Sequence, residues 1–408
     1  MQNNYLAQVG TFSKANSAWG LPEGTWVTEG KDQNVRLNDG TWYLDWVSGL
    51  GSNILGYDST FLNTVCSGIK RGTGFSLSHK IEYEVAEKLA KMLRANVPGW
   101  SDRDIKVRFC KTGSEATTMA VRLARAVTDR QKIGSFYDHY HGWESWAIAR
   151  TAPAYGVLNE ERWACVPLEW DNPFTFEQNG FNESVAAVIF EHPSYDVENV
   201  DWYSTLREKT NQVGALLIAD EIVTGLRYGL GGACGLFNIK PDLMCIGKAL
   251  GNGFPIAAVV GPAEYLDWFN RIDPVFCSST HWGETASLYA ANYVLDNWDQ
   301  SWVDNLWEIG DTLISKLRAA GWDVFGHPPR SVLRFTSEKE RAFFIKYMFE
   351  NGILMNRPNF PNLCHTSDDQ RMTYGCAMNA RIKYDNMSSK EIDEYVEGRM
   401  PRVLFSGR

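Results

Sequence analysis

The spacing of apolar residues changes along the chain and predicts strands in some stretches and helices in others. Between residues 26 and 46, apolar and polar positions alternate around an Asn-Asp-Gly turn at 38–40, which predicts a β-hairpin or meander. From residue 80 to residue 93, apolar positions recur at helical spacing: Ile81, Val85, Leu89 and Met92. Near the C-terminus, Ser388 and Glu391 have the spacing of a capping box, so a helix is expected from there to about Met400.

The middle of the chain alternates short apolar runs with stretches of helical periodicity. Strands are expected at residues 105–109, 132–136, 185–190, 215–219, 243–246 and 256–260, and helices at 116–127 and 202–211. This alternation predicts a mostly parallel sheet covered by helices, in a large α/β domain. The two ends predict a smaller α+β domain. We place an N-terminal segment of the small domain at residues 1–60, the large domain at 61–300 and the rest of the small domain at 301–408.

The composition of the 408 residues excludes several classes of protein. Hydrophobic residues make up 44% of the chain, which is enough to fill packed cores and excludes a mainly disordered protein. The formal net charge of −9 argues against nucleic acid as a partner, because phosphate backbones favour clustered Lys and Arg. No apolar run approaches the roughly 20 residues that span a bilayer, and the N-terminus lacks the pattern of a secretory signal, so no membrane association is expected.

The cysteines give no sign of a disulfide framework or a metal site. The eight cysteines are scattered and form no C-x-x-C pair. Two histidines, His139 and His141, lie close together, but no third ligand with suitable spacing accompanies them. We therefore expect a reduced, cytoplasmic enzyme without a metal.

Polar residues follow several of the predicted strands, at the edge where open parallel sheets bind ligands. After the strand at 105–109, Thr112, Gly113 and Ser114 offer hydroxyls and backbone N–H groups at a helix N-terminus. That end of a helix suits a phosphate, although Ser or Thr before a helix is more often an ordinary N-cap. The chain has no Walker-type nucleotide-binding motif, so an enzyme of that class is disfavoured.

Two further strand ends carry acidic and basic groups. The strand at 215–219 leads into Asp220 and Glu221, and a carboxylate there can serve a metal, a ribose or a protonated ring nitrogen, or be structural. Lys248 follows the strand at 243–246 and is flanked by glycines, and a partly desolvated lysine can act as a Schiff-base nucleophile. With an aromatic ring from Tyr140 to stack on, these parts match what pyridoxal 5′-phosphate requires.

With these motifs the chain resembles the class III, fold-type I pyridoxal-phosphate aminotransferases. Within that class it is most similar to the branch of glutamate-1-semialdehyde aminomutases and their aminotransferase relatives. Residues 112–116 match the Ser-Gly-Thr-Glu-Ala phosphate loop, residues 140–142 match Tyr-His-Gly, and residues 220–227 match Asp-Glu-Val-x-Thr-Gly-Phe-Arg. The motifs occur in the family's order and spacing, over roughly residues 25–400.

The resemblance implies a fold, a cofactor and a set of site residues. The fold is α/β, with a large domain around a mostly parallel, seven-stranded type of sheet and a smaller α+β domain from both chain ends. The cofactor is pyridoxal 5′-phosphate, and a homodimer is implied in which Thr280 reaches the partner's cofactor. Lys248 and Asp220 are the implied catalytic residues. The implied cofactor-binding residues are Thr112, Gly113, Ser114, Tyr140, His141, Glu191, Asp220, Ile222, Lys248 and Thr280.

The sequence departs from the family's pattern at a few places near these motifs. Lys111 stands where an Asn-type residue is usual, and His192 comes between Glu191 and the proline that normally follows it. His281 and Trp282 are bulkier than the residues common in the mutases, and residues 48–53 differ from the mutase pattern at the opening of the pocket. These departures favour a relative that acts on another amino or oxo compound.

Three functions stay open from the sequence. The first is an aminotransferase that moves an amino group between a small-molecule donor and an oxo acceptor, through a lysine Schiff base and the pyridoxamine form of the cofactor. The second is an intramolecular 2,1-aminomutase that uses the same residues and retains its intermediate behind a mobile gate at 151–171. The third is a catalytically silent protein of the same fold, which the retained Lys248 and Asp220 disfavour. The residue that binds a substrate carboxylate is left open among Arg150, Arg227, Arg357 and Arg381.

Overall fold

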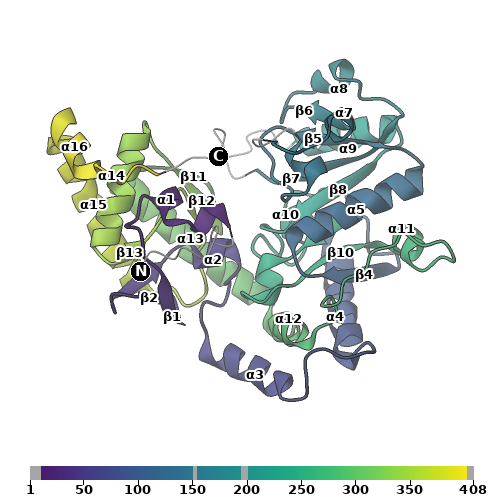
Figure 1. The fold of residues 1–408 in the computed structure, drawn as a ribbon, viewed down its shortest axis with the longest axis horizontal. Helices are drawn as coiled ribbons and strands as arrows, with labels where there is room; N and C mark the ends of the chain where they lie inside the picture. The colour runs from purple at the N-terminus through teal and green to yellow at the C-terminus, as the bar shows by residue number, and fades with distance from the viewer. Residues whose placement is uncertain (1–10, 150–153, 194–200, 402–408) are drawn as a thin grey trace. The chain divides into compact units, whose positions relative to one another are not determined.

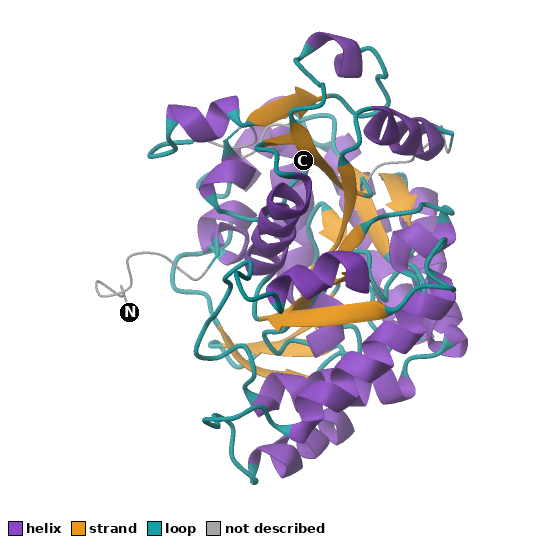
Figure 2. Ribbon diagram, turned by 90° about the vertical axis from the view of Figure 1, so that its right-hand side faces the viewer, coloured by secondary structure: helices purple, strands orange, loops and turns teal. Residues whose placement is uncertain are grey.

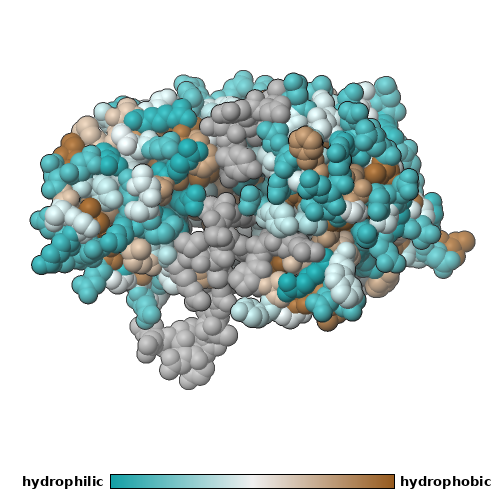
Figure 3. Space-filling view, turned by 90° about the horizontal axis from the view of Figure 1, so that it is seen from above, coloured by the Kyte–Doolittle hydropathy of each residue, from teal (hydrophilic) through white to brown (hydrophobic). Residues whose placement is uncertain are grey.

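The computed structural model describes residues 11–149, 154–193 and 201–401 (Figure 1). These residues form two compact units. Residues 60–193 and 201–303 form the large unit, and residues 11–59 and 304–401 form the small unit. In the view of Figure 3 the described surface is mainly hydrophilic, with apolar residues interspersed. None of the described helices combines the length and the apolar character that crossing a bilayer requires.

The large unit is built on a seven-stranded sheet of order β4-β10-β9-β8-β7-β5-β6. Strand β10 runs antiparallel to both of its neighbours, and the other pairings are parallel. This arrangement confirms the mostly parallel sheet that the sequence predicts. The strands are β4 (Ile105–Cys110), β5 (Lys132–Phe136), β6 (Cys165–Leu168), β7 (Val185–Glu191), β8 (Leu216–Glu221), β9 (Leu243–Ile246) and β10 (Ala257–Pro262).

Helices cover the sheet, as Figure 2 shows for the orange strands among the purple helices. Helix α5 packs across strands β7 to β10, and α9 packs against β8. The α-helices of this unit are α3 (Ser59–Ile69), α4 (Lys80–Asn96), α5 (Gly113–Thr128), α6 (Ser145–Ile148), α7 (Asn159–Trp163), α8 (Thr175–Gln178), α9 (Trp202–Gln212), α10 (Gly232–Leu236), α11 (Ala263–Leu266) and α12 (Thr285–Asn297). Two 3₁₀ helices accompany them, η2 (Lys248–Gly251) and η3 (Asp267–Phe269).

The register of the sheet lines up polar residues at one edge. Glu191 at the end of β7 lies opposite Asp220 in β8, and Asp220 lies opposite Cys245 in β9. Because these strands are parallel, their carboxyl ends meet at the same edge, where ligands bind in sheets of this kind. The sheet therefore brings together residues that are far apart in the sequence.

The small unit combines both ends of the described chain. Strand β13 runs parallel to β3 in a four-stranded sheet of order β1-β2-β3-β13, with Ile353 opposite Leu44. A three-stranded antiparallel sheet has the order β11-β12-β14. The strands are β1 (Val27–Lys31), β2 (Asn34–Leu37), β3 (Trp42–Asp45), β11 (Asp323–His327), β12 (Arg330–Arg334), β13 (Ile353–Leu354) and β14 (Pro358–Asn359). The helices are η1 (Phe12–Lys14), α1 (Asn16–Trp19), α2 (Ser48–Gly51), most of α13 (Gln300–Ala319), α14 (Glu338–Glu350), α15 (Ser367–Asn386) and α16 (Ser389–Val396).

One expectation about local structure needs correction, and one predicted segment contains elements that the sequence did not indicate. The C-terminal helix α16 ends at Val396 and does not reach Met400, because Glu397 leaves the helical conformation with a ψ of 129° and Gly398 follows with a φ of +69°. The stretch 151–171, interpreted from the sequence as a mobile gate, contains α7 and the sheet-edge strand β6, and its first residues, 151–153, lie outside the described part of the chain. Pro167 hides β6 in the sequence, since proline is tolerated in a strand only at an edge such as this one.

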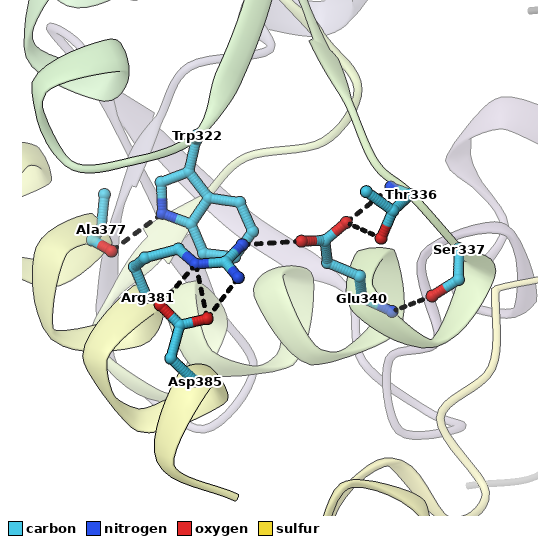
Figure 4. Close-up of polar contacts among 7 residues, drawn as sticks. All are labelled: Trp322, Thr336, Ser337, Glu340, Ala377, Arg381 and Asp385. Atoms are coloured by element: carbon cyan, nitrogen blue, oxygen red, sulfur yellow. Dashed lines mark hydrogen bonds and ion pairs between the residues drawn. The ribbon is translucent and has the colours of Figure 1, made fainter. Parts of the chain in front are cut away.

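An arginine-centred cluster joins α14 and α15 of the small unit to Trp322 and Thr336, which lie just outside the strands β11 and β12 (Figure 4). The Arg381 guanidinium donates to Asp385 one turn along α15 and, at 2.7 Å, to the buried carboxylate of Glu340 in α14. Glu340 also accepts hydrogen bonds from the N–H and the hydroxyl of Thr336, and the guanidinium lies 5.2 Å from the ring centre of Trp322. The hydrogen bonds with Asp385 and Glu340 outweigh desolvation and raise the pKa of Arg381.

We expect Arg381→Met to lower the free energy of unfolding by about 2–4 kcal/mol, because it leaves the Glu340 carboxylate buried without its cation. Urea denaturation followed by tryptophan fluorescence measures the change. The matched control is Lys390→Met in α16, which removes an exposed ion pair with Glu394 and should cost less than about 1 kcal/mol. Equal losses in the two variants would contradict a central role for the Arg381 cluster.

Candidate active site

The N-cap Thr112 and the first residues of α5, Gly113 and Ser114, form the candidate phosphate loop, residues 112–114. The hydroxyl of Thr112 accepts a hydrogen bond from the N–H of Glu115 at 3.2 Å, and the Glu115 carboxylate accepts one from the N–H of Thr112 at 2.8 Å. This capping box fixes the start of α5. The N–H groups of Gly113 and Ser114 lie in the first turn of the helix, ahead of the intrahelical bonds, where an anion is favoured.

Asp220 lies near the end of β8 and is buried. It lies on the same face of the sheet as Ile218, two residues earlier, which packs with α5 in one apolar cluster. Its Oδ2 atom is 2.8 Å from Nδ1 of His141, and its Oδ1 atom accepts the N–H of Ile222 at 3.1 Å. The carboxylate is thus held by two groups and keeps lone pairs for a third donor.

Ile222 connects the phosphate loop to the strand end that carries Lys248. A Cβ atom added at Gly113 would lie 3.0 Å from Cγ2 of Ile222, and a Cβ atom added at Gly247 would lie 3.1 Å from Cδ1 of Ile222. The two glycines therefore lie against one isoleucine side chain, two residues after Asp220. This contact brings Lys248, Asp220 and the phosphate loop to one place at the edge of the sheet.

Lys248 begins the short helix η2 in a backbone conformation that lysine rarely adopts. Its φ is +42°, in the left-handed region, and its side chain is half-buried. A left-handed residue other than glycine costs of order 1 kcal/mol and occurs most often at functional sites. The preceding residue, Gly247, has no side chain to separate the backbone from Ile222.

The segment 140–142 crosses the start of α5. Gly142 has a φ of +108°, and a Cβ atom there would lie 2.4 Å from the hydroxyl oxygen of Ser114. The N–H of Tyr140 donates to the carboxylate of Glu191 at 3.0 Å, and the hydroxyl of Thr117 donates to the carbonyl of His141 at 2.6 Å. These contacts hold His141 where its ring reaches Asp220, while the ring of Tyr140 stays partly exposed.

Eight of the ten predicted site residues are linked by these contacts or lie next to a linked residue, and Lys248 is placed beside them through its neighbour Gly247. Thr280 is different, because it is exposed in a turn and no contact described above reaches it. Its expected role involves a second subunit. Sequence reasoning missed Glu115 as part of the site, although the Thr-x-x-Glu spacing at 112–115 is itself a capping-box signature. The eight linked residues are Thr112, Gly113, Ser114, Tyr140, His141, Glu191, Asp220 and Ile222.

Glu221, next to Asp220, is occupied by structural contacts on the opposite face of the strand. Its carboxylate accepts the N–H of Ala233 at 3.0 Å, the N–H of Cys234 at 2.7 Å and the hydroxyl of Thr224. Burial raises the pKa of Glu221 and outweighs these hydrogen bonds. Of the two carboxylates, only Asp220 is directed toward the candidate site.

His192 and two of the four arginines considered for binding a substrate carboxylate are buried or paired within the protein. His192 is buried, stacks on Phe237 with ring centres 4.5 Å apart and contacts the Tyr203 hydroxyl through Nδ1. Among the candidates for a carboxylate clamp, Arg227 is completely buried, and Arg381 is held by the cluster described above. Arg150 lies outside the described residues, and Arg357 is half-buried in the small unit. Within the described residues, no cluster of His, Cys, Asp and Glu has the arrangement of a metal site.

The sequence matches the Aminotransferase class-III family over residues 17–165 and 171–325. The chain belongs to the class III aminotransferase family. Similar proteins named glutamate-1-semialdehyde 2,1-aminomutase are 32% identical over 256 residues in Sulfolobus acidocaldarius and 30% identical over 308 residues in Methanococcus maripaludis. These alignments cover 59% of this chain and 59% of the Sulfolobus protein, and 72% of this chain and 70% of the Methanococcus protein.

Solved structures of transaminases share the fold of this class III chain. An ω-transaminase from Sphaerobacter thermophilus superimposes with a TM-score of 0.82 at 22% identity, covering 91% of this chain and 94% of the other. A glutamate-1-semialdehyde aminomutase from Pseudomonas aeruginosa, in complex with PMP, has a TM-score of 0.75 at 18% identity and covers 87% of each chain. The fold is that of the fold-type I pyridoxal-phosphate enzymes.

Class III aminotransferases use pyridoxal 5′-phosphate, and the residues of the site fit this cofactor. Gly113 and Gly247 let the phosphate loop and the backbone before Lys248 approach the Ile222 side chain closely. The N–H groups at the start of α5 suit the phosphate, and the buried Asp220 carboxylate, with an oxygen lone pair to spare, suits a protonated ring nitrogen. The amine of Lys248 suits the aldehyde.

We expect Gly142→Ala to weaken binding of pyridoxal phosphate at least about tenfold, a loss of about 1.4 kcal/mol. The new methyl group would collide with Ser114, and alanine is strained at a φ of +108°. Fluorescence titration of the apo-protein with the cofactor measures the affinity. The control is Gly156→Ala, at a φ of +81° with no heavy atom within 4 Å of the added Cβ, which carries backbone strain without a collision. Equal effects would show that strain, and not the close approach to Ser114, accounts for the loss.

Proposed function

We propose that this class III protein is an aminotransferase that moves an amino group from a small amine or amino acid to an oxo acceptor. The observation that carries the proposal is the meeting of Lys248, Asp220 and the phosphate loop around Ile222. Bound pyridoxal phosphate supplies an aldehyde that takes up the amino group and a ring that stabilises negative charge at the substrate carbon. The remaining work falls to the side chains of the chain itself.

The catalytic roles follow from the chemistry of two side chains. Lys248 would hold the cofactor through its aldehyde carbon, and once the substrate's amine takes its place there, the free Nζ amine would move a proton between the substrate carbon and that carbon. The Asp220 carboxylate holds a proton on the ring nitrogen. His141 is a positioning residue, because Nδ1–H donation to Asp220 fixes the direction of the carboxylate. The imidazole Nε2 atom is buried and has no hydrogen-bond partner among the described residues, so Asp220 is the side chain that orients this ring.

The other site residues hold the cofactor in this proposal. Residues 112–114 bind the phosphate, Tyr140 and Ile222 pack on the two faces of the ring, and Glu191 fixes the backbone at Tyr140. Each of these roles is carried over from the family's motifs and agrees with the positions of the residues at the edge of the sheet.

We further propose a homodimer in which Thr280 contacts the partner's cofactor phosphate. Large apolar side chains are exposed near the segment that carries Thr280, as at a surface that a second copy covers. The N–H of Thr285 donates to the carbonyl of Thr73 at 3.0 Å, so the two exposed segments adjoin. The exposed apolar residues are Phe75, Leu77, Tyr83 and Phe276.

A cytoplasmic location is proposed from the free cysteines of the described residues.

An intramolecular aminomutase is the second candidate function. The specific observation in its favour is that the similar proteins from Sulfolobus acidocaldarius and Methanococcus maripaludis both carry the name glutamate-1-semialdehyde 2,1-aminomutase. The same side chains serve both reactions. What differs is whether the oxo product leaves before the amino group is returned.

An absorption scan of the holoenzyme, with amine donors added one at a time, separates the two functions. A transaminase loses the visible absorption of the aldehyde form of the cofactor with each effective donor and releases one oxo product per site. A mutase isomerises glutamate-1-semialdehyde without a second substrate and releases no oxo acid. If neither behaviour occurs with a broad panel of donors, the proposal of amino transfer fails.

We expect Lys248→Ala to lower kcat with the best donor by at least about 10³-fold, because the proposal assigns both the bond to the aldehyde carbon and the proton transfer to this amine, whereas the nearby Lys111 amine is paired with Glu284. Stopped-flow absorbance with that donor measures the rate. The matched control is Lys240→Ala, an exposed lysine of the same unit, which should leave kcat within about twofold. Normal turnover by Lys248→Ala would assign this lysine a structural role.

A further inference from the structure

Lys111, one of the departures from the family's pattern, forms an ion pair with a distant segment of the same unit. Its Nζ atom is 2.8 Å from Oε1 of Glu284, and the two side chains are only 12% and 19% exposed. Glu284 also caps α12 by accepting the N–H groups of Ala286 and Ser287. Burial opposes ionisation of Glu284, but the bonds from Lys111 and Ser287 outweigh it and lower the pKa. The charge of Lys111 is therefore neutralised by a protein carboxylate beside the phosphate loop.

A second hydrogen bond joins the same two segments. Nε1 of Trp282 donates to Oε1 of Glu115 at 3.0 Å, while Oε2 of Glu115 accepts the backbone N–H groups of Lys111 and Thr112. Glu115 thus closes the capping box of α5 with one oxygen and holds Trp282 with the other. Two of the residues that depart from the family's pattern, Lys111 and Trp282, take part in these contacts.

We propose that Lys111 and Glu115 are positioning residues that hold the segment 280–284 against the phosphate loop, so that Thr280 is fixed for binding a cofactor phosphate. Thr280 lies two residues before Trp282 and four before Glu284, so both contacts restrain the backbone that carries its hydroxyl. The inference rests on the proposed function, in which Thr280 serves the partner's cofactor. In each subunit, the phosphate loop that binds one cofactor is then fixed to the segment whose Thr280 contacts the cofactor of the partner subunit.

If the proposal holds, the ion pair between Lys111 and Glu284 strengthens binding of the cofactor's phosphate and has no effect on binding of its aldehyde or ring nitrogen. Pyridoxal lacks the phosphate but keeps the aldehyde and the ring nitrogen. We expect Lys111→Met to weaken pyridoxal 5′-phosphate binding to the apo-protein about five- to tenfold and to leave pyridoxal binding within about twofold. Titration of the full-length protein, followed by tryptophan fluorescence, measures both constants. Glu284→Gln keeps an oxygen that can cap α12 and should produce the same selective loss.

Two further variants test whether the effect passes through Thr280. In a Thr280→Ala background, Lys111→Met should weaken phosphate-dependent binding no further, since the threonine that it positions is gone. The matched control is Lys106→Met, which removes a lysine of the same strand β4 that pairs with Asp267 at 2.6 Å and should leave both affinities unchanged. Additive losses for Lys111→Met and Thr280→Ala would overturn the proposal.

The outcomes also separate this inference from the proposed function. If the unmodified protein binds pyridoxal 5′-phosphate and transfers amino groups while Lys111→Met loses affinity for both ligands equally, the inference is overturned and the proposed function stands. Unchanged affinity in Lys111→Met overturns it too. If the unmodified protein fails to bind pyridoxal 5′-phosphate at all, the proposed function fails first.

Discussion

Two adjacent carboxylates at the buried end of β8 impose the strictest constraint on the large unit. Asp220 and Glu221 point to opposite faces of the sheet, because successive residues of a strand alternate, and both are removed from water. Each buried carboxylate needs its own set of donors. Asp220 receives His141 and the N–H of Ile222, whereas Glu221 receives Thr224 and two N–H groups at the start of α10. Satisfying the first carboxylate positions the 140–142 segment, and satisfying the second folds the loop that follows β8.

The candidate site depends on close backbone approaches that only small residues allow. Gly113 and Gly247 lie against the Ile222 side chain, and Gly142 lies against Ser114, so segments that follow the four strands β4, β5, β8 and β9 converge closely. Lys248 is held in a left-handed conformation at the same edge. Strain of this kind persists only where the surrounding structure enforces it, and here the enforcing structure is the buried sheet itself.

The sequence was sufficient to predict the elements on which the site depends, because each motif is local. The strands at 132–136 and 243–246 are found where the apolar runs predicted them, and the phosphate loop follows from a strand, a capping threonine and a helix. Strand β6 was missed because Pro167 breaks its pattern, and an edge position that tolerates proline is known only once the sheet is assembled. The ion pair between Lys111 and Glu284 spans 173 residues, and no local period or spacing could have indicated it.

The same distinction explains why substrate identity is harder to predict from the sequence than the chemistry of amino transfer. The groups proposed for amino transfer lie within a few residues of strand ends, so a motif in the sequence predicts their positions. A single arginine is enough to bind the carboxylate of a substrate. An arginine can do so only if no buried acidic side chain of the protein already pairs with it. Arg381 is paired with Glu340 and Asp385, and Arg227 is completely buried. Specificity therefore depends on long-range pairing, which the fold determines and a single motif does not contain.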